Sequence, residues 1–317
     1  MFIMQSTDKV IAILCADLHL AAKPPVCRLG EGDWFAAMAR PLREISDLSN
    51  EYDAPVLCAG DVFDRWNCSP ELINFALENL PDDMYSIPGQ HDLPFHRLDS
   101  MNQSAYGTMV ISNTIVDLGS NDHTVDDVPG ALLNGNIHVF GFPWGSELKP
   151  CPCPEEKFFK IALVHKFVWS KKETGYYGVS DTEHVSNYLK KLKGYDVVVF
   201  GDNHKGFKVT STKTGQIILN CGTMMRRTIA EVDYRPRVRL MYSSGIVKLH
   251  YLDTTMDKLD VPNEVDSRSV DLSAFSDSLE NLGEDPLDFY EAIDKAKVDC
   301  SQGASDVLTE VLDSYEE

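Results

Sequence analysis

The chain has 317 residues, 43% of them hydrophobic, and a formal net charge of -20. This length suits one large domain with a full core, or a domain with a smaller appendage. No run of about 18 apolar residues and no secretory signal pattern is present, so we expect a cytoplasmic protein without a membrane span. The eight cysteines are scattered, several of them inside apolar runs, which is typical of reduced core thiols.

Charge is unevenly distributed along the chain. Residues 157–239 hold 16 Lys and Arg against 7 Asp and Glu, a local net of +9. Residues 260–317 hold 17 acidic residues against 3 basic ones, a local net of -14. The basic stretch is a candidate surface for a polyanion such as DNA, although such charges also occur on ordinary solvated surfaces.

Short β-rich apolar runs alternate with helical stretches in the first two thirds of the chain. The predicted strands are residues 10–15, 55–59, 137–142, 160–164, 196–200 and 216–220. Several of these runs are apolar on both faces, which is typical of a sheet buried between layers. The predicted helices are residues 34–48, 69–80 and 180–192, and Ser69 followed by Pro70 favours the start of the second. The alternation predicts an α/β fold.

The composition changes at about residue 260. The segment beyond it is acidic and poor in β-branched runs, with amphipathic pieces at residues 287–293 and 307–312. An apolar stripe on a short acidic helix must pack against something, either its own domain or a partner. We therefore divide the chain into a domain at residues 1–259 and an acidic C-terminal segment at residues 260–317, helical or partly disordered.

Five polar clusters follow the predicted strands or lie close to them. They are Asp17-Leu-His19, Gly60-Asp61-Val-Phe-Asp64-Arg65, Gly89-Gln90-His91-Asp92, His165, and Gly201-Asp202-Asn-His204. The C-terminal ends of strands are where α/β sheets gather their functional side chains. One such cluster occurs by chance in many loops, but five in sequence order indicate a shared site.

The residue types in these clusters favour a metal centre. Carboxylate and imidazole groups without clustered thiols suit Mn²⁺, Fe²⁺, Mg²⁺ or Zn²⁺. Two such ions roughly 3.5–4 Å apart can stabilise both ends of an in-line phosphoryl displacement. A group that bridges two ions should be a carboxylate, which has two oxygens to share, and Asp61 is the candidate bridge.

The order of these clusters resembles that of calcineurin-like metallophosphoesterases over roughly residues 10–240. Within that family, Ala59-Gly-Asp-Val-Phe-Asp64 is most similar to nucleases, and to SbcD-type DNA-repair exonuclease subunits in particular. The resemblance implies a metallophosphoesterase-type layered β-sandwich flanked by helices, followed here by the acidic C-terminal tail. It also implies two-metal-dependent hydrolysis of DNA phosphodiester bonds, as an exonuclease or endonuclease, in a homodimer that pairs with a coiled-coil, SMC-like ATPase subunit.

Carried over by position, the resemblance implies two metal ions and one general acid. The ligands implied for one metal are Asp17, His19, Asp61 and His204, and those for the other are Asp61, Gln90, His165 and Asp202. His91 would protonate the leaving oxygen, since imidazoles titrate near working pH, and Asp92 would orient it. Gln90 stands where Asn is usual and Asp202 where His is usual. The additional carboxylate favours Mn²⁺, or Mg²⁺, over Zn²⁺.

Arg226 and Arg227 lie beyond the strand predicted at residues 216–220. They are candidates for contacts with DNA phosphates, and the alternative is that they are ordinary surface arginines.

Two functions other than that of a nuclease stay open. A phosphatase or small cyclic-nucleotide phosphodiesterase would use the same metal core, but would not need the basic stretch. A non-catalytic scaffold subunit for an ATPase is suggested by the unusual residues at positions 90 and 202.

Overall fold

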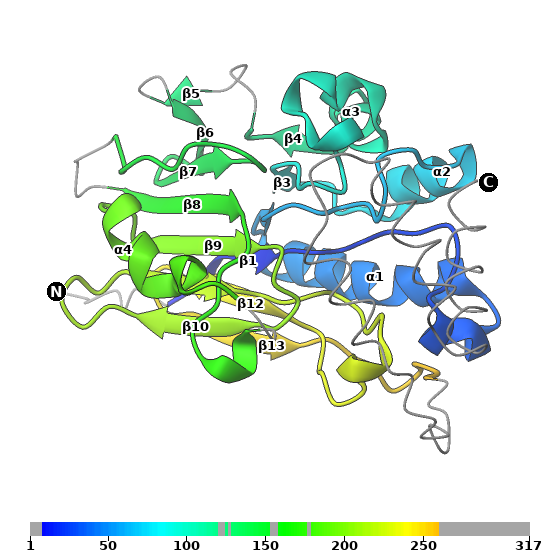
Figure 1. The fold of residues 1–317 in the computed structure, drawn as a ribbon. Helices are drawn as coiled ribbons and strands as arrows, with labels where there is room; N and C mark the ends of the chain where they lie inside the picture. The colour runs from blue at the N-terminus through cyan, green and yellow to red at the C-terminus, as the bar shows by residue number, and fades with distance from the viewer. Residues whose placement is uncertain (1–7, 120–123, 126–127, 153–157, 176–178, 260–317) are drawn as a thin grey trace, which may run out of the picture. The chain divides into compact units, whose positions relative to one another are not determined.

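The computed structural model describes residues 8–119, 124–125, 128–152, 158–175 and 179–259 (Figure 1). Residue contacts divide the chain into two units, residues 1–261 and 262–317, and the described residues all belong to the first. The acidic segment at residues 260–317, with the amphipathic pieces predicted in it, lies outside the described residues.

Two β-sheets form the frame of the described domain. The first has the strand order β13-β12-β1-β2-β3-β4, and β1 to β4 run parallel. The second has the order β10-β11-β9-β8-β7-β6-β5, and β11, β9, β8 and β7 run parallel. The first sheet consists of β1 (Val10–Cys15), β2 (Val56–Cys58), β3 (Met84–Ser86), β4 (Val116–Asp117), β12 (Arg237–Tyr242) and β13 (Val247–Tyr251). The second consists of β5 (Thr124–Val125), β6 (Val128–Leu133), β7 (Ile137–Phe142), β8 (Phe159–His165), β9 (Val197–Gly201), β10 (Phe207–Thr210) and β11 (Ile217–Asn220).

The three longest α-helices begin where the sequence provides a capping side chain. Asp33 accepts a hydrogen bond from the backbone N of Ala36 at the start of α1, and Ser69 accepts one from Leu72 at the start of α2. The α-helices are α1 (Trp34–Tyr52), α2 (Pro70–Asn79), α3 (Ala105–Ile111) and α4 (Tyr188–Lys191). The 3₁₀ helices are η1 (Val26–Glu31), η2 (Pro94–His96), η3 (Leu98–Gln103), η4 (Lys172–Thr174), η5 (Asp181–Glu183), η6 (Val185–Asn187) and η7 (Ile229–Glu231). Among the described helices, none has the length and apolar composition that crossing a lipid bilayer requires.

Apolar side chains fill three layers of the domain. Leu14 of β1 and Leu163 of β8 belong to one cluster, which lies between the two sheets. The neighbouring Ile13 instead packs with Leu42 of α1, in a cluster that joins the first sheet to α1, α2 and α3. Tyr188 of α4 belongs to a third cluster, against the outer face of the second sheet. The fold is therefore a layered β-sandwich flanked by helices, as the sequence predicted (Figure 1).

The six predicted strands are all present, but the helix predicted at residues 180–192 is wrong. In its place the chain forms two short 3₁₀ turns, and α4 covers only Tyr188–Lys191. The backbone of His184 is extended, with ψ 138°, and this residue forms a parallel bridge with Trp169. Backbone N of Val185 also donates to the carbonyl O of Trp169 over 2.8 Å. This pairing with a distant segment outweighs the local helical pattern.

Candidate metal centre

The ends of five strands bring the predicted polar clusters to one edge of the sandwich. β1 leads to Asp17 and His19, β2 to Asp61, β3 to Gln90 and His91, and β9 to Asp202 and His204, while β8 ends at His165. Backbone hydrogen bonds join these loops, since the N atoms of Asp17 and His19 donate to the carbonyls of Gly60 and Asp61 over 3.0 Å. The convergence matches the placement of functional side chains expected for this class of fold.

The backbone at this edge is unusual. Asp17, His19, Asp61 and Asp202 have φ values of 54°, 47°, 52° and 76°, in the left-handed region that non-glycine residues rarely adopt. Such residues cost on the order of 1–3 kcal/mol each and concentrate at functional sites, where the surrounding structure holds them. Gly89 is required here for a different reason, because a Cβ at this position would collide with the carboxylate of Asp61. The candidate ligands are thus positioned by left-handed backbone at four residues and by the close approach of Gly89 to Asp61.

Asp61 lies at the centre of the cluster and is 1% exposed. Its Oδ2 is 3.3 Å from Nε2 of His165 and 3.8 Å from Nε2 of His19. Its Oδ1 accepts a hydrogen bond of 3.1 Å from the backbone N of His91. One carboxylate oxygen therefore faces an imidazole from each sheet, which is the position that a carboxylate bridging two cations needs.

Three groups of side chains have their possible ligand atoms within 4.8 Å of one another. The groups are Asp17, His19 and His204; Asp17, Asp61 and His165; and His19, Asp64 and His91. Nε2 of His19 and Nε2 of His204 are 3.0 Å apart, a separation that suits two imidazole ligands of one cation. Asp17 belongs to two of the groups, so it lies beside both sets of ligands implied by the resemblance and not beside one alone.

Five buried atoms of this cluster have no hydrogen-bond partner among the described residues. They are Oδ2 of Asp17, Nδ1 of His19, Oδ2 of Asp61, Oε1 of Gln90 and Nε2 of His165. Leaving such atoms unsatisfied costs about 1–3 kcal/mol each, and more for charged groups. The three carboxylate and amide oxygens and Nε2 of His165 are together a donor set that fits divalent cations.

The hydrogen bond made by Nδ1 of His165 leaves the other ring nitrogen, Nε2, as the possible metal ligand. Nδ1 of His165 is 2.6 Å from the carbonyl O of Ala59, and a carbonyl can only accept, so Nδ1 carries a hydrogen. In the neutral ring, Nε2 then presents its lone pair towards Asp61. Burial alone would lower the pKa of His165, but the charge of Asp61 raises it to about 10. A bound cation would therefore replace a proton at this nitrogen, as is general for imidazole ligands.

The two central carboxylates have opposite pKa shifts. Burial raises the pKa of Asp17 to about 6, although His204 and His165 oppose the shift. Burial acts on Asp61 in the same direction, but the nearby imidazoles of His165 and His19 outweigh it and hold the pKa of Asp61 well below its usual range. The central carboxylate is therefore ionised at neutral pH and is available as a ligand.

His91 lies at the rim of the cluster, with an exposed side chain. Its Nδ1 is 2.8 Å from the carbonyl O of Asp64, which can only accept, so Nδ1 donates and Nε2 is left for proton transfer. This is the arrangement that a general acid needs. Asp64 thus orients the imidazole through its backbone.

Asp92 does not have the contact predicted for it, which was to orient the imidazole of the general acid. Its buried carboxylate instead accepts hydrogen bonds from the backbone N atoms of Val62, Phe63 and Gly89, at 3.2, 2.9 and 3.0 Å. Burial, followed by the charge of Asp61, raises the pKa of Asp92 to about 7, and the three hydrogen bonds oppose this shift. Asp92 fixes the loop backbone around the central carboxylate, and its role is structural support of that loop.

The two unusual residues, Gln90 and Asp202, are adjacent in the site. Nε2 of Gln90 donates to Oδ1 of Asp202 over 2.7 Å, and the backbone N of Asp202 donates to Oδ1 of Asp17 over 2.9 Å. Hydrogen bonds therefore link both positions to Asp17, and their role as metal ligands stays a prediction.

Two acidic residues near the cluster had no predicted role. Oδ1 of Asp64 is 3.7 Å from Nδ1 of His19. Oε1 of Glu231 is 3.6 Å from Nδ1 of His204. Burial lowers the pKa of that imidazole, but its contact with Glu231 and the charge of Asp17 outweigh burial and raise the pKa above its usual value. Partners of this kind orient imidazole ligands. Asp64 belongs to the second polar cluster, so its position in that motif could have predicted that it lies near the site. The Thr228-x-x-Glu231 capping pattern predicts a turn there, but not its contact with His204.

Arg226 and Arg227 lie in different surroundings. The guanidinium of Arg227 forms an ion pair with Asp64 at the edge of the cluster and is 18% exposed. Nη2 of Arg226 instead is 2.9 Å from Oδ2 of Asp257, and the carbonyl O of Arg226 accepts from Nη1 of Arg28. Of the two arginines, Arg227 is thus the one that the fold brings to the site.

A family model described as calcineurin-like phosphoesterase matches residues 12–206, more than half of the 317 residues and all of the candidate ligands. The chain belongs to the calcineurin-like phosphoesterase family. Members use divalent metal ions to hydrolyse phosphoesters, which agrees with the donor set described above. The identity of the metals and the SbcD-type assignment stay predictions.

Solved structures of similar fold include two nucleotidases. One is the 5'-nucleotidase precursor of Thermus thermophilus, with 14% identity, a TM-score of 0.42, and coverage of 76% of this chain and 54% of that one. The other is the NAD nucleotidase NadN of Haemophilus influenzae, with 12% identity, a TM-score of 0.41, and coverage of 79% and 53%. This chain thus spans about half the length of these structures. No curated protein matches it significantly.

Proposed function

We propose that this protein hydrolyses DNA phosphodiester bonds with two divalent metal ions, as a nuclease of DNA repair or recombination similar to SbcD-type subunits. The main support is the set of four buried, unpartnered ligand atoms that lie beside an exposed imidazole. Mn²⁺ is the proposed metal and Mg²⁺ the second choice, because the donor set is rich in carboxylate and amide oxygens.

In this proposal the chain's own groups hold the cations and move one proton. One cation would be held by Asp17, His19, Asp61 and His204, and the other by Asp61, Gln90, His165 and Asp202. When bound, two divalent cations supply charge stabilisation for the transferring phosphoryl group and for the attacking water. Nε2 of His91 donates a proton to the leaving oxygen, so that the departing strand leaves as an alcohol.

Two features support a nucleic acid as the substrate over a small phosphoester. Arg227 lies at the edge of the cluster, where a phosphate next to the scissile one could displace Asp64 from its guanidinium. The surrounding stretch of residues 157–239 carries a net charge of +9, from 16 basic and 7 acidic residues. Backbone binding to DNA uses such surfaces, whereas a mononucleotide needs only the site itself.

The proposal includes partners that follow from the SbcD-type assignment. We propose a homodimer that pairs with a coiled-coil, SMC-like ATPase subunit, with the acidic segment at residues 260–317 as its docking element. Truncation after Leu259 tests the docking element. If the shortened chain keeps its melting temperature and hydrolytic activity but no longer associates with the ATPase, the docking role is supported. If it unfolds or precipitates, the segment is part of the domain core.

One set of assays separates the proposal from its two alternatives. Purified protein with Mn²⁺ or Mg²⁺ is incubated with end-labelled linear DNA, circular DNA and p-nitrophenyl phosphate. Metal-dependent cleavage of DNA supports the nuclease. Turnover of the phosphomonoester alone would assign the same metal core to a phosphatase. A protein that contains no metal and has no activity on any substrate would be the scaffold.

A further inference from the structure

An unusual piece of backbone follows the general-acid candidate. Phe95 and His96 are consecutive, and both have left-handed backbone, with φ 51° and 56°. The loop that carries them is tied directly to the metal cluster, because the N of Leu93 donates to the carbonyl O of Gln90 and the N of His96 to that of Leu93. For a bulky aromatic residue this backbone conformation is a genuine outlier.

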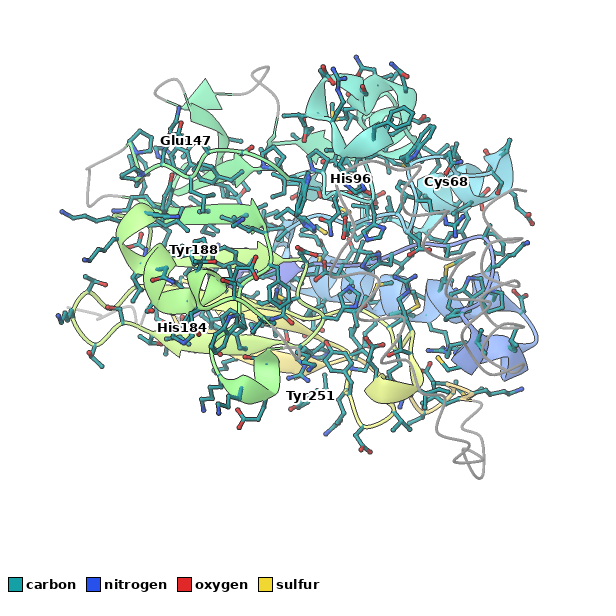
Figure 2. All side chains as sticks on the ribbon, in the orientation of Figure 1. Cys68, His96, Glu147, His184, Tyr188 and Tyr251 are labelled. Atoms are coloured by element: carbon teal, nitrogen blue, oxygen red, sulfur yellow. The ribbon has the colours of Figure 1, made fainter. Side chains whose placement is uncertain are left out.

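These two residues place their rings beside two tryptophans. The ring centroids of Phe95 and Trp66 are 6.2 Å apart, with an angle of 39° between the planes. His96, labelled in Figure 2, has its ring 6.3 Å from that of Trp144. The Trp144 ring is in turn 6.4 Å from that of the ligand candidate His165. Aromatic residues from three different loops therefore form two ring pairs, and one of these pairs reaches the site through Trp144.

One basic side chain, Lys166, lines a hollow with Trp144, and another, Arg65, is next to Trp66 in the sequence. A hollow of about 200 Å³ is lined in part by Trp144, His165 and Lys166. Arg65 directly precedes Trp66 and is exposed. Aromatic faces alternating with cations are the chemistry that binds single-stranded nucleic acid, because bases stack on the rings and phosphates pair with Lys and Arg.

Packing within the described part of the chain does not account for the conformation of Phe95. Its side chain is 80% exposed, so it contributes little burial of apolar surface. Its left-handed backbone is strained as well. A residue that is both exposed and strained destabilises the free protein, and strain of this kind is typical of ligand-binding loops.

We propose that Phe95 and Trp66, together with His96 and Trp144, stack unpaired nucleobases next to the scissile phosphate. The substrate is then a single-stranded end or segment of DNA. Inside an intact duplex, neighbouring base pairs cover both faces of each base, and the terminal pair leaves one face uncovered. Several rings can therefore stack on bases only where the strand is unpaired. This inference rests on the proposed nuclease function and adds the substrate class to it.

The test compares variants that keep or remove the aromatic face. Binding of a fluorescein-labelled oligothymidine is measured by anisotropy with Mn²⁺, in a His91→Ala background that slows turnover. Phe95→Leu keeps apolar bulk but has no aromatic face, and it should weaken binding about 10-fold, which corresponds to about 1.4 kcal/mol and lies within the range for one base–aromatic stack. Phe95→Trp should bind as tightly as the parent. Ile246→Ala, in the β12–β13 turn and 50% exposed in the parent, is the distant control.

An abasic oligonucleotide of the same length separates stacking from charge. It should bind the parent and Phe95→Leu equally, because it offers phosphates but no bases. If Phe95→Leu binds oligothymidine as tightly as the parent, the stacking inference is overturned while the nuclease proposal stands. If Phe95→Leu loses self-association with oligothymidine binding unchanged, the ring belongs to an interface between copies, and the inference is likewise overturned. A wild-type protein that hydrolyses bis(p-nitrophenyl) phosphate but binds neither oligothymidine nor duplex DNA would overturn both proposals.

Discussion

Gln90 and Asp202 are hydrogen-bonded to each other across the metal cluster, with Nε2 of Gln90 donating to Oδ1 of Asp202 over 2.7 Å. These are the two positions at which the sequence departs from the pattern it otherwise resembles. Because the amide nitrogen faces the carboxylate, the amide oxygen Oε1 is directed elsewhere, buried and without a partner among the described residues. The two departures thus form one hydrogen-bonded pair.

This pairing predicts non-additive effects on metal binding. Gln90→Ala and Asp202→Ala should each weaken binding of one Mn²⁺ ion. The double variant should be little worse than either single variant, with a coupling energy of about 0.5–3 kcal/mol, because the first change already disrupts the pair. Isothermal titration with Mn²⁺ measures all four proteins, and Gln103→Ala, at an exposed position of η3, is the matched control. Strictly additive losses would show that the two residues act independently.

His91 should be needed for turnover and not for metal binding. His91→Ala removes the nitrogen left free by the hydrogen bond to the Asp64 carbonyl, and the rate should fall by about 10²–10⁴-fold. Metal content by elemental analysis should stay at the wild-type value. His250→Ala, at a histidine paired with Glu44, should retain the wild-type rate. Near-full activity of His91→Ala would rule out the general-acid role.

Replacement of Asp61 should weaken the binding of both metal ions. Its Oδ2 faces His165 on one side and His19 on the other, so Asp61→Asn removes the anionic ligand from both sets. We expect metal content to fall well below that of His204→Ala, which removes a ligand from one set only. Anomalous scattering at the manganese edge would measure each position separately. Two fully occupied ions in Asp61→Asn would contradict the bridging role.

Arg226→Ala and Arg227→Ala should separate stability from substrate binding. Arg226 pairs with Asp257, and both side chains are largely buried, with exposures of 13% and 9%. Its loss should destabilise the protein by about 1–3 kcal/mol, visible as a melting temperature lowered by several degrees. Arg227→Ala should leave stability closer to the wild type but weaken DNA binding and flatten its dependence on salt. Equal salt slopes for Arg227→Ala and the wild type would move the DNA-binding surface elsewhere.

The sequence allowed the candidate ligands to be proposed because most of them closely follow an apolar run that forms a strand. Side-chain roles that depend on distant contacts were not predictable in this way. Asp92 looked like a partner of the neighbouring His91, yet its carboxylate is turned towards the backbone of residues 62 and 63. Glu231 contacts His204 from the segment that follows β11 in the sequence, so no short-range residue spacing could have predicted that contact.

Glu31 lies in a buried ion network with Arg28 and Arg40. Its Oε1 accepts from Nε of Arg28 over 2.9 Å and from the backbone N of Lys258 over 3.0 Å, while its Oε2 accepts from Nη2 of Arg40 over 2.9 Å. Burial would raise the pKa of Glu31, but the hydrogen bonds from Lys258 and Arg40 and the charge of Arg28 outweigh it, so the pKa lies below its usual value.

The direction of this shift predicts a stability effect that depends on pH. A carboxyl group whose pKa is lower in the folded than in the unfolded chain stabilises the fold above the unfolded value, about 4.3 for Glu, and loses that contribution as the pH falls through the folded value. Glu31→Gln should therefore lower the melting temperature at pH 7, and the difference from the wild type should shrink below about pH 4. Calorimetry of both proteins between pH 7 and pH 3 measures this, with Glu147→Gln, at an exposed position, as the control. A melting-temperature difference that is constant across this range would show that Glu31 acts by packing and not by its charge.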